Sequence, residues 1–274
     1  PGWKAIVSCY LPVAAPLSLM VELFNNKPRL SWIDQSNDET KFVIERSTNS
    51  PKRFEIIGEA TANSTSFVDN SAPANALCYY RVRAYRDTQG SPNSNVAELG
   101  IGNAPFLMKD SVLITCDKIF MDEGGVDMMG EANQVKTVTF KPSIPGNRVG
   151  VVFSNFRILY STLYVFNGSS VQSPQIGYYS GTNIPPILDG TSADGSLTFY
   201  FYSSASYNDS GWVAQVSCCK PVANPSGLQV NLNGSQKPAL LWTDNADDET
   251  NYIVERSVNA PGLFTPLANL AANS

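Results

Sequence analysis

The sequence LSWIDQSNDETKFVIERS at residues 30–47 returns in similar form as LLWTDNADDETNYIVERS at residues 240–257. Nine of the eighteen aligned positions are identical, and most of the others are conservative, such as Phe42 and Tyr252. Internal repetition of this kind indicates a modular architecture. Apolar and polar residues alternate within each copy, which is typical of β-strands. We therefore expect a repeated unit made of β-strands.

The repetition extends beyond these two stretches. GWKAIVSC at residues 2–9 returns as GWVAQVSC at residues 211–218, and the tripeptide at residues 62–64 returns at residues 272–274. The offset is 209 residues before the turn near Asn25 and 210 residues after it. The sequence thus holds one period of about 210 residues and the first 64 residues of the next. A period of this length corresponds to two ordinary domains, not to one turn of a solenoid.

Composition excludes several classes of function. The 274-residue chain has a net charge of −5 and a pI of about 4.8, which argue against a nucleic-acid partner or an anionic membrane surface. Its longest apolar runs, such as residues 149–153, are too short to span a bilayer. It contains no histidine, so these residues can form neither a Ser-His-Asp or Cys-His catalytic arrangement nor a histidine metal site.

Two acidic clusters are the remaining candidates for catalysis. Asp122 and Glu123 form one, and Asp247, Asp248 and Glu249 form the other. A retaining glycosidase requires two carboxyl groups about 5 Å apart. Both clusters stand in turn-like sequences, so we expect solvent-exposed loop acids instead. The chain also has no phosphate-binding glycine loop, and it is predicted not to be an enzyme and to need no cofactor.

Residues 15–102 contain short alternating segments that are separated by turn signals rich in Asn, Asp, Gly and Pro. This pattern favours a β-sandwich with Trp32 in its core. The stretches LSWIDQSNDETKFVIERS and CYYRVRAY (residues 78–85) closely resemble the second, third and sixth strands of a bacterial fibronectin type III domain. In this resemblance Cys78 stands where the family places a tyrosine that hydrogen-bonds at a strand corner. The resemblance therefore implies a departure from the family at that corner.

Residues 103–220 contain five further informative stretches: DEGG (122–125), YVFNG (164–168), IGYYSGTNIPP (176–186), SLTFYFYSS (196–204) and SGWVAQVSC (210–218). With these stretches, residues 103–220 resemble a CUB domain, a jelly-roll-like sandwich of two β-sheets. The two resemblances together imply an all-β chain of tandem β-sandwiches, in which CUB-like jelly rolls alternate with immunoglobulin-like fibronectin type III domains. They divide the chain into the last strand of a truncated CUB-like domain (1–14), a fibronectin type III domain (15–102), a CUB-like domain (103–220) and the first half of a second fibronectin type III domain (221–274).

The CUB resemblance also bears on metal binding, because many CUB domains hold Ca²⁺ with acidic residues on neighbouring loops. The corresponding positions carry Ser161 and Ser204, with Arg157 on an adjoining segment. Calcium requires several oxygen ligands that include carboxylates, so this set is unsuited to it. Asp209 lies close by in sequence and leaves a shifted site as the alternative. We predict a CUB-like scaffold without a metal.

The sequence contains five cysteines. The first and last strands of such sandwiches often lie adjacent, so the resemblance favours a disulfide between Cys116, which opens the CUB-like domain, and Cys218, which closes it. Cys9 corresponds to Cys218 in the repeat, so its partner is expected to precede residue 1. The pairing of Cys78 and Cys219 stays open. A disulfide indicates an oxidising compartment, and we expect a secreted protein in the extracellular space or at the cell surface.

Short motifs mark candidate glycosylation sites. Asn-x-Ser/Thr acceptors occur at Asn63, Asn167, Asn208 and Asn233. The tripeptide at residues 110–112 resembles an O-glycosylation site of Bacteroidota, with Ser111 as the acceptor. Motifs this short occur often by chance, so they indicate candidates only.

These features together resemble a Bacteroidota-like multidomain surface protein. They predict a non-catalytic extracellular segment of a long adhesin, stalk or filament, with adjacent modules of the same longer chain and neighbouring copies as its partners. Two alternatives stay open. Exposed aromatic residues such as Tyr178, Tyr179 and Tyr207 would contact a glycan or a surface protein, or the chain would be an accessory part of a secreted hydrolase.

Overall fold

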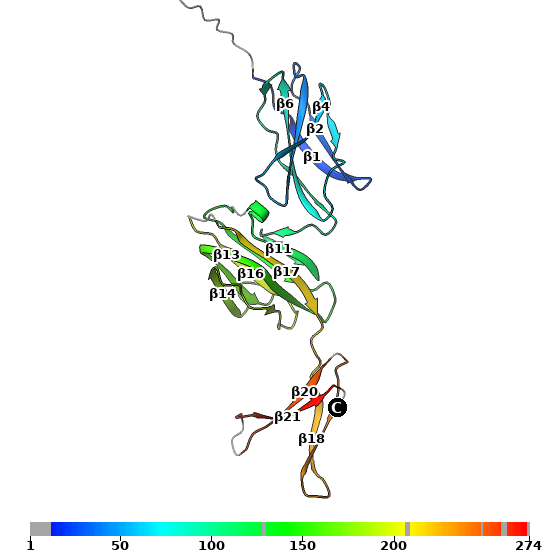
Figure 1. Cartoon of the computed structure of the whole chain (residues 1–274), viewed down its shortest axis with the longest axis vertical. Helices are drawn as coiled ribbons and strands as arrows, with labels where there is room; N and C mark the ends of the chain where they lie inside the picture. Colours follow the sequence, from blue (N-terminus) through cyan, green and yellow to red (C-terminus); the bar gives the residue numbers. More distant parts are fainter. Residues whose placement is uncertain (1–11, 128–129, 206–208, 248, 259–261, 273–274) are drawn as a thin grey trace, which may run out of the picture. The chain divides into compact units, whose positions relative to one another are not determined.

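A computed structural model describes residues 12–127, 130–205, 209–247, 249–258 and 262–272 (Figure 1). Within them the regular elements are twenty-one β-strands and one short 3₁₀ helix, η1 (Gly125–Asp127). The chain is thus all-β. No helix among these residues is long and apolar enough to cross a membrane. The chain separates into two compact units, residues 1–219 and residues 220–274.

The first unit opens with a sandwich of two β-sheets. One sheet has the order β1–β2–β5, and the other has the order β4–β3–β6, with β7 and β8 also paired to β6. The strands are β1 (Leu17–Phe24), β2 (Lys27–Ile33), β3 (Lys41–Thr48), β4 (Glu55–Thr61), β5 (Ser66–Val68), β6 (Ala76–Arg86), β7 (Gln89–Gly90) and β8 (Ala97–Ile101). Alternate residues of β2, Leu30 and Trp32, are buried because strand side chains point in turn to opposite faces. They pack with Phe42 of β3 in the core between the sheets.

Two details of this sandwich differ from what the sequence led us to expect. Val13, only 2% exposed, packs in the same core, so the module includes residues before position 15. The strand corner also has its tyrosine bond. The hydroxyl of Tyr80 donates to Asp69 Oδ2 at 3.0 Å, and Cys78 is buried two residues earlier on β6. The expected departure at this corner was therefore wrong, because Tyr80, not residue 78, reaches the carboxylate.

The second sandwich of this unit is built around one long strand, β13 (Arg148–Asn167), which belongs to both of its sheets. The other strands are β9 (Phe106–Leu107), β10 (Ser111–Ile114), β11 (Asp117–Met121), β12 (Val135–Lys141), β14 (Gln175–Gly181), β15 (Leu188–Asp189), β16 (Leu197–Tyr202) and β17 (Gly211–Cys219). The first half of β13 pairs with β17, and the second half pairs with β14 and β16. Tyr160 lies between the halves with φ of 61°, a left-handed conformation that changes the direction of the strand.

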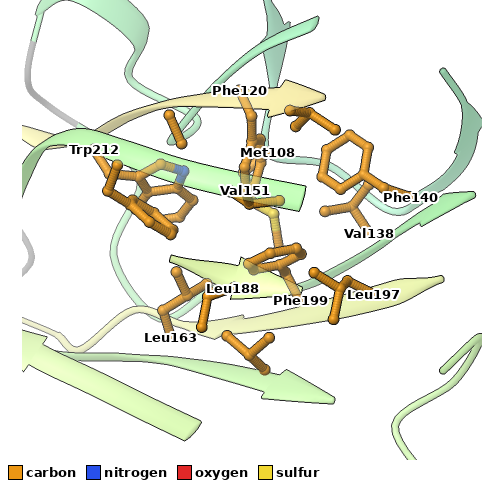
Figure 2. Close-up of a cluster of buried hydrophobic side chains, with 14 of the residues drawn as sticks. Met108, Phe120, Val138, Phe140, Val151, Leu163, Leu188, Leu197, Phe199 and Trp212 are labelled. Carbon is orange, nitrogen blue, oxygen red and sulfur yellow. The ribbon is translucent and has the colours of Figure 1, made fainter. Parts of the chain in front are cut away.

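The core of the second sandwich is rich in aromatic rings (Figure 2). Phe120 of β11 is fully buried, and its ring centroid lies 5.0 Å from that of Phe140 and 5.4 Å from those of Phe199 and Trp212. Rings in this edge-to-face arrangement stabilise one another beyond the burial of their area. The alternation in the sequence of β16 explains the packing, because its odd-numbered apolar residues point inward and its tyrosines point outward.

The second unit contains two hairpins that repeat the first half of the first sandwich. They consist of β18 (Ser226–Leu232) with β19 (Pro238–Thr243), and β20 (Asn251–Arg256) with β21 (Thr265–Ala271). The register shift between Ile44 and Glu45 in β3 returns between Val254 and Glu255 in β20. The positive φ of 52° at Ser18 returns as 63° at Gly227. The two copies thus share details of the backbone as well as of the sequence.

Candidate functional site

A disulfide joins Cys116 to Cys218 in the second sandwich. Cys116 directly precedes β11, and Cys218 lies near the end of β17. These two strands pair in antiparallel register, with Asp117 opposite Ser217, so the two cysteine Cα atoms come within 4.8 Å. The bond closes a chain segment with a sequence separation of 102, which includes nearly all of this sandwich.

The other described cysteines are free thiols. Cys78 lies in the core of the first sandwich, and burial raises the pKa of its thiol, which makes it an unreactive group at neutral pH. Cys219 is exposed, and its Sγ accepts a hydrogen bond from Arg148 Nε at 3.3 Å. Cys9, whose partner was expected before residue 1, lies outside the described residues. The predicted strand at residues 1–14 lies largely outside them as well.

Residues of the two sandwiches of the first unit meet in a small buried cluster, which we call the junction cluster. Its buried members are Tyr79, Leu107 and Met121, at 8%, 6% and 8% exposure, and Phe54, Leu77 and Val213 pack against them. The cluster includes side chains from β6 of the first sandwich and from β9, β11 and β17 of the second. Apolar contact therefore supports the connection between these two modules.

The turn after β11 completes the junction. The backbone N–H of Val126 donates to the carbonyl oxygen of Asn49 at 3.1 Å. Gly125 lies against the same carbonyl with φ of 61°, and a Cβ there would come within 2.0 Å of the Asn49 oxygen. Only glycine combines this backbone conformation with so close an approach. The second glycine of the DEGG stretch thus has a role in holding the two modules together.

A cavity of about 470 Å³ adjoins the junction cluster. Its charged side chains include Lys109, which pairs with Glu98 at 3.2 Å, and Lys136, which pairs with Glu123 at 2.7 Å. Lys118 donates to Asn103 Oδ1 at 2.8 Å. Each of these three lysines is therefore paired with a neighbouring polar group.

The expectation that Asp122 and Glu123 are solvent-exposed loop acids was wrong. Asp122 is fully buried, and Glu123 is 7% exposed. Glu123 forms the ion pair with Lys136, and its other oxygen accepts a hydrogen bond from the Glu131 N–H at 2.7 Å. Asp122 accepts a hydrogen bond from the Gly124 N–H at 3.2 Å. Both acids thus stabilise the turn after β11. In the other acidic cluster Asp247 is exposed and pairs with Lys220, and Asp248 lies outside the described residues.

The region corresponding to a calcium site contains two polar contacts. Ser161 Oγ accepts a hydrogen bond from the Ser204 N–H at 3.2 Å. Arg157 Nε lies 3.7 Å from Asp209 Oδ1, so a guanidinium stands beside the carboxylate that a shifted calcium site would use. Within the described residues no group of three or more His, Cys, Asp or Glu residues could hold a metal ion.

The candidate glycosylation residues differ in their surroundings. The side chain of Asn167 is engaged at both ends: Nδ2 donates to Thr191 Oγ1 at 2.8 Å, and Oδ1 accepts from the Ser192 N–H at 2.9 Å. A glycan at Asn167 would therefore require these bonds to break. Asn63 and Asn233 are exposed in turns. Ser111 is half-buried on β10, and Asn208 lies outside the described residues.

Three tyrosines from adjacent strands form a row on the outer face of the second sandwich, which we call the tyrosine ladder. Tyr178 of β14 pairs across the strands with Tyr164 of β13, and Tyr164 pairs with Tyr200 of β16. Their ring centroids are 6.4 Å and 5.9 Å apart. Tyr178 is 69% exposed, while Tyr164 and Tyr200 are half-buried.

Two of the aromatic residues singled out in the sequence do not belong to this ladder. Tyr179 is half-buried and packs against the core, with its ring 6.5 Å from that of Phe156. Tyr207 lies outside the described residues. Tyr178 was among the aromatic residues predicted from the sequence, whereas Tyr164 and Tyr200 were not. The missed signal was the alternation of YVFN and FYFY, which places these tyrosines on the face opposite the core.

No family model matches the chain, and no curated protein matches it. Among solved structures, a fibronectin type III-like protein from Clostridium thermocellum is 23% identical with a TM-score of 0.30, covering 35% of this chain and 100% of that chain. The MASP-1 CUB2 domain bound to Ca²⁺ is 15% identical with a TM-score of 0.34, covering 40% and 98%. Pectate lyase Pel3 from Pectobacterium carotovorum is 21% identical with a TM-score of 0.29, covering 36% and 35%. The chain is an all-β protein of tandem β-sandwich modules, and the solved structures similar to parts of it include fibronectin type III-like and CUB domains.

Proposed function

We propose that this chain is a non-catalytic segment of a longer extracellular protein, a bacterial surface adhesin, stalk or filament. In it, CUB-like and fibronectin type III-like sandwiches alternate with a period of about 210 residues. The observation that carries the proposal is the duplication of β1–β4 as β18–β21, which extends to the same register shifts. A chain that repeats whole modules builds length, which is what a stalk or filament requires.

The connections within the first unit support a role in resisting tension. The junction cluster and the Val126–Asn49 hydrogen bond hold the two sandwiches to each other. The Cys116–Cys218 disulfide closes the second sandwich, so tension applied at its ends cannot extend the residues between the two cysteines. A disulfide also favours an extracellular location, because it persists in oxidising compartments.

The proposed partners are further modules of the same longer chain and neighbouring copies in a filament. In the first sandwich, β3 pairs with both β4 and β6. In the described part of the second unit, β20 pairs with β21. A segment equivalent to β5–β8 is therefore the partner that we expect for the second unit, since it covers the corresponding strands in the first copy.

Surface shaving of the source cells tests this proposal. Intact cells would be treated briefly with a protease, and the released peptides would be identified by mass spectrometry, with a cytosolic enzyme as the control for lysis. The proposal predicts that peptides from residues 12–272 are released while the cytosolic enzyme is not. Recovery of the chain only after lysis would contradict an extracellular stalk or adhesin.

A further inference from the structure

We propose that the tyrosine ladder of the second sandwich binds a neutral glycan, which would lie across strands β14, β13 and β16. The three rings occupy directly paired positions, so they form one continuous aromatic row. A tyrosine ring offers an apolar face and a hydroxyl at its tip. A sugar ring has the matching character, with C–H groups on its faces and hydroxyls around its rim.

The first sandwich has different contacts between its strands. Glu45 lies opposite Arg81 with an Nε–Oε2 distance of 2.7 Å, and Lys41 of β3 lies 2.6 Å from Glu59 of β4. Ion pairs thus join those strands, whereas the row on the second sandwich is aromatic. Aromatic side chains are enriched at binding surfaces, which favours a binding role for this row.

The surroundings of the ladder determine what kind of ligand fits. The outward positions of β14, of the second half of β13 and of β16 are all described, and they carry no Asp, Glu, Lys or Arg. Thr137 lies opposite Tyr200, and Thr162 lies opposite Tyr202. These three strands therefore offer hydroxyl groups beside aromatic rings, and their outward positions supply no charge with which to pair an ionic ligand. These groups match a neutral sugar chain, and they do not match an acidic polysaccharide or a charged peptide.

The edge of the face is equally suited to an extended ligand. Tyr178 is the outermost ring of the row and is 69% exposed, and Tyr202 on β16 is 47% exposed. Both rings can therefore be covered without any change in the core. This inference concerns the second sandwich alone and holds whether or not the chain belongs to a filament.

Affinity electrophoresis of the full chain in native gels tests the proposal. The gels would contain a neutral β-glucan, a neutral xylan or a neutral mannan, with polygalacturonate as the acidic counterpart. The variants are Tyr178→Ala and, as the matched control, Tyr160→Ala, whose ring is 81% exposed at the bend of β13 and outside the cross-strand row. Thermal melting of each variant would verify that it is folded.

The proposal predicts retardation by at least one of the neutral polysaccharides and none by polygalacturonate. Tyr178→Ala should weaken that binding roughly tenfold, as loss of an aromatic contact does, while Tyr160→Ala should bind like the unmodified chain. Absence of retardation by all three neutral polysaccharides would overturn the proposal, as would equal binding by Tyr178→Ala and Tyr160→Ala. Sedimentation would reveal whether a second copy of the chain occupies the ladder instead. If the chain binds no glycan but self-associates, and Tyr178→Ala abolishes that self-association, the ladder is a contact between copies and the proposal is overturned.

Discussion

The two copies of the repeated half-sandwich have the same local structure but different burial. Trp32 and Phe42 have ring centroids 5.4 Å apart, and their counterparts Trp242 and Tyr252 are 5.7 Å apart. Trp32 is 4% exposed, whereas Trp242 is half-buried. In the first copy β6 pairs with β3, and its Tyr80 and Val82 belong to the same core as Trp32. The hairpins and the ring pair are therefore encoded locally, whereas full burial of the tryptophan depends on the strands that follow.

The largest expected effect comes from the disulfide, which only the first unit contains. Replacing Cys116 and Cys218 together by alanine should destabilise the second sandwich by about 4–5 kcal/mol, because the bond closes a loop of 102 residues in the unfolded chain. Residues 220–274 contain no cysteine and should be unaffected. Urea unfolding with and without reductant would measure this difference. A loss below about 1 kcal/mol would contradict a structural role for the bond.

A matched pair of tryptophan substitutions tests the difference in burial directly. Trp32→Ala should cost about 3–5 kcal/mol, because it removes a large side chain from a complete core. Trp242→Ala should cost clearly less, because its ring is already partly in water. Chemical denaturation of each variant, monitored by a signal from the unit that carries the substitution, would give both losses in the free energy of unfolding. Equal losses would show that the second copy is packed as tightly as the first.

The corner of the first sandwich should make its stability depend on pH. Burial by itself would raise the pKa of Asp69, but hydrogen bonds from Arg46 and Ser71 outweigh it, so the pKa is lowered. A lowered carboxyl pKa stabilises the fold above the unfolded value of about 4, and this stabilisation is lost as the pH falls through the folded value. The urea midpoint should therefore decrease in acid.

The matched variant is Asp69→Asn, which should cost about 1–3 kcal/mol at neutral pH because it leaves the Arg46 guanidinium without its anion. It should also reduce the dependence on pH below about 4, since the titrating group is gone. Unfolding midpoints of both proteins between neutral pH and acid would provide the comparison. Parallel decreases in the two proteins would exclude Asp69 as the source.

The smallest expected effect concerns one backbone position that the two copies fill differently. Ser18 and Gly227 both have positive φ, 52° and 63°. Ser18→Gly should stabilise the first copy, and Gly227→Ser should destabilise the second, each by about 1 kcal/mol, because left-handed backbone is costly for residues with a Cβ. Differential scanning calorimetry of both variants would measure the shifts. Changes of the same sign would contradict the equivalence of the two positions.

Local patterns accounted for much of the fold. The alternation in LSWIDQ predicted the strand that buries Trp32, and the repeat predicted that the second copy would form the same hairpins. The resemblance to CUB domains favoured the Cys116–Cys218 pair, and the structure contains it. These features depend on the sequence within one strand or on one pair of neighbouring strands, so the sequence carries enough information about them.

Features that depend on register between distant strands could not be derived from the sequence. Asp122 was expected in solvent, but the start of β17 covers it, and a Cβ at Gly211 would come within 2.0 Å of its carboxyl carbon. The sequence put the corner bond in doubt because Cys78 was assigned to the tyrosine position, but Tyr80 makes that bond, since its meeting with Asp69 depends on how β5 and β6 are placed. The tyrosine ladder requires the pairing of β14, β13 and β16, which no single strand reveals.

The mass of the intact source polypeptide is the most direct test of whether this chain is a segment of a longer repeat protein. Extracts of the source cells would be separated on a denaturing gel with and without reductant, and the band would be identified by peptides from residues 12–272. A repeat protein of alternating sandwiches predicts a polypeptide several times larger than the 29.7 kDa of this sequence, with lower mobility after reduction because closed disulfide loops open. A single band near 29.7 kDa would contradict the account of a long multidomain stalk or filament.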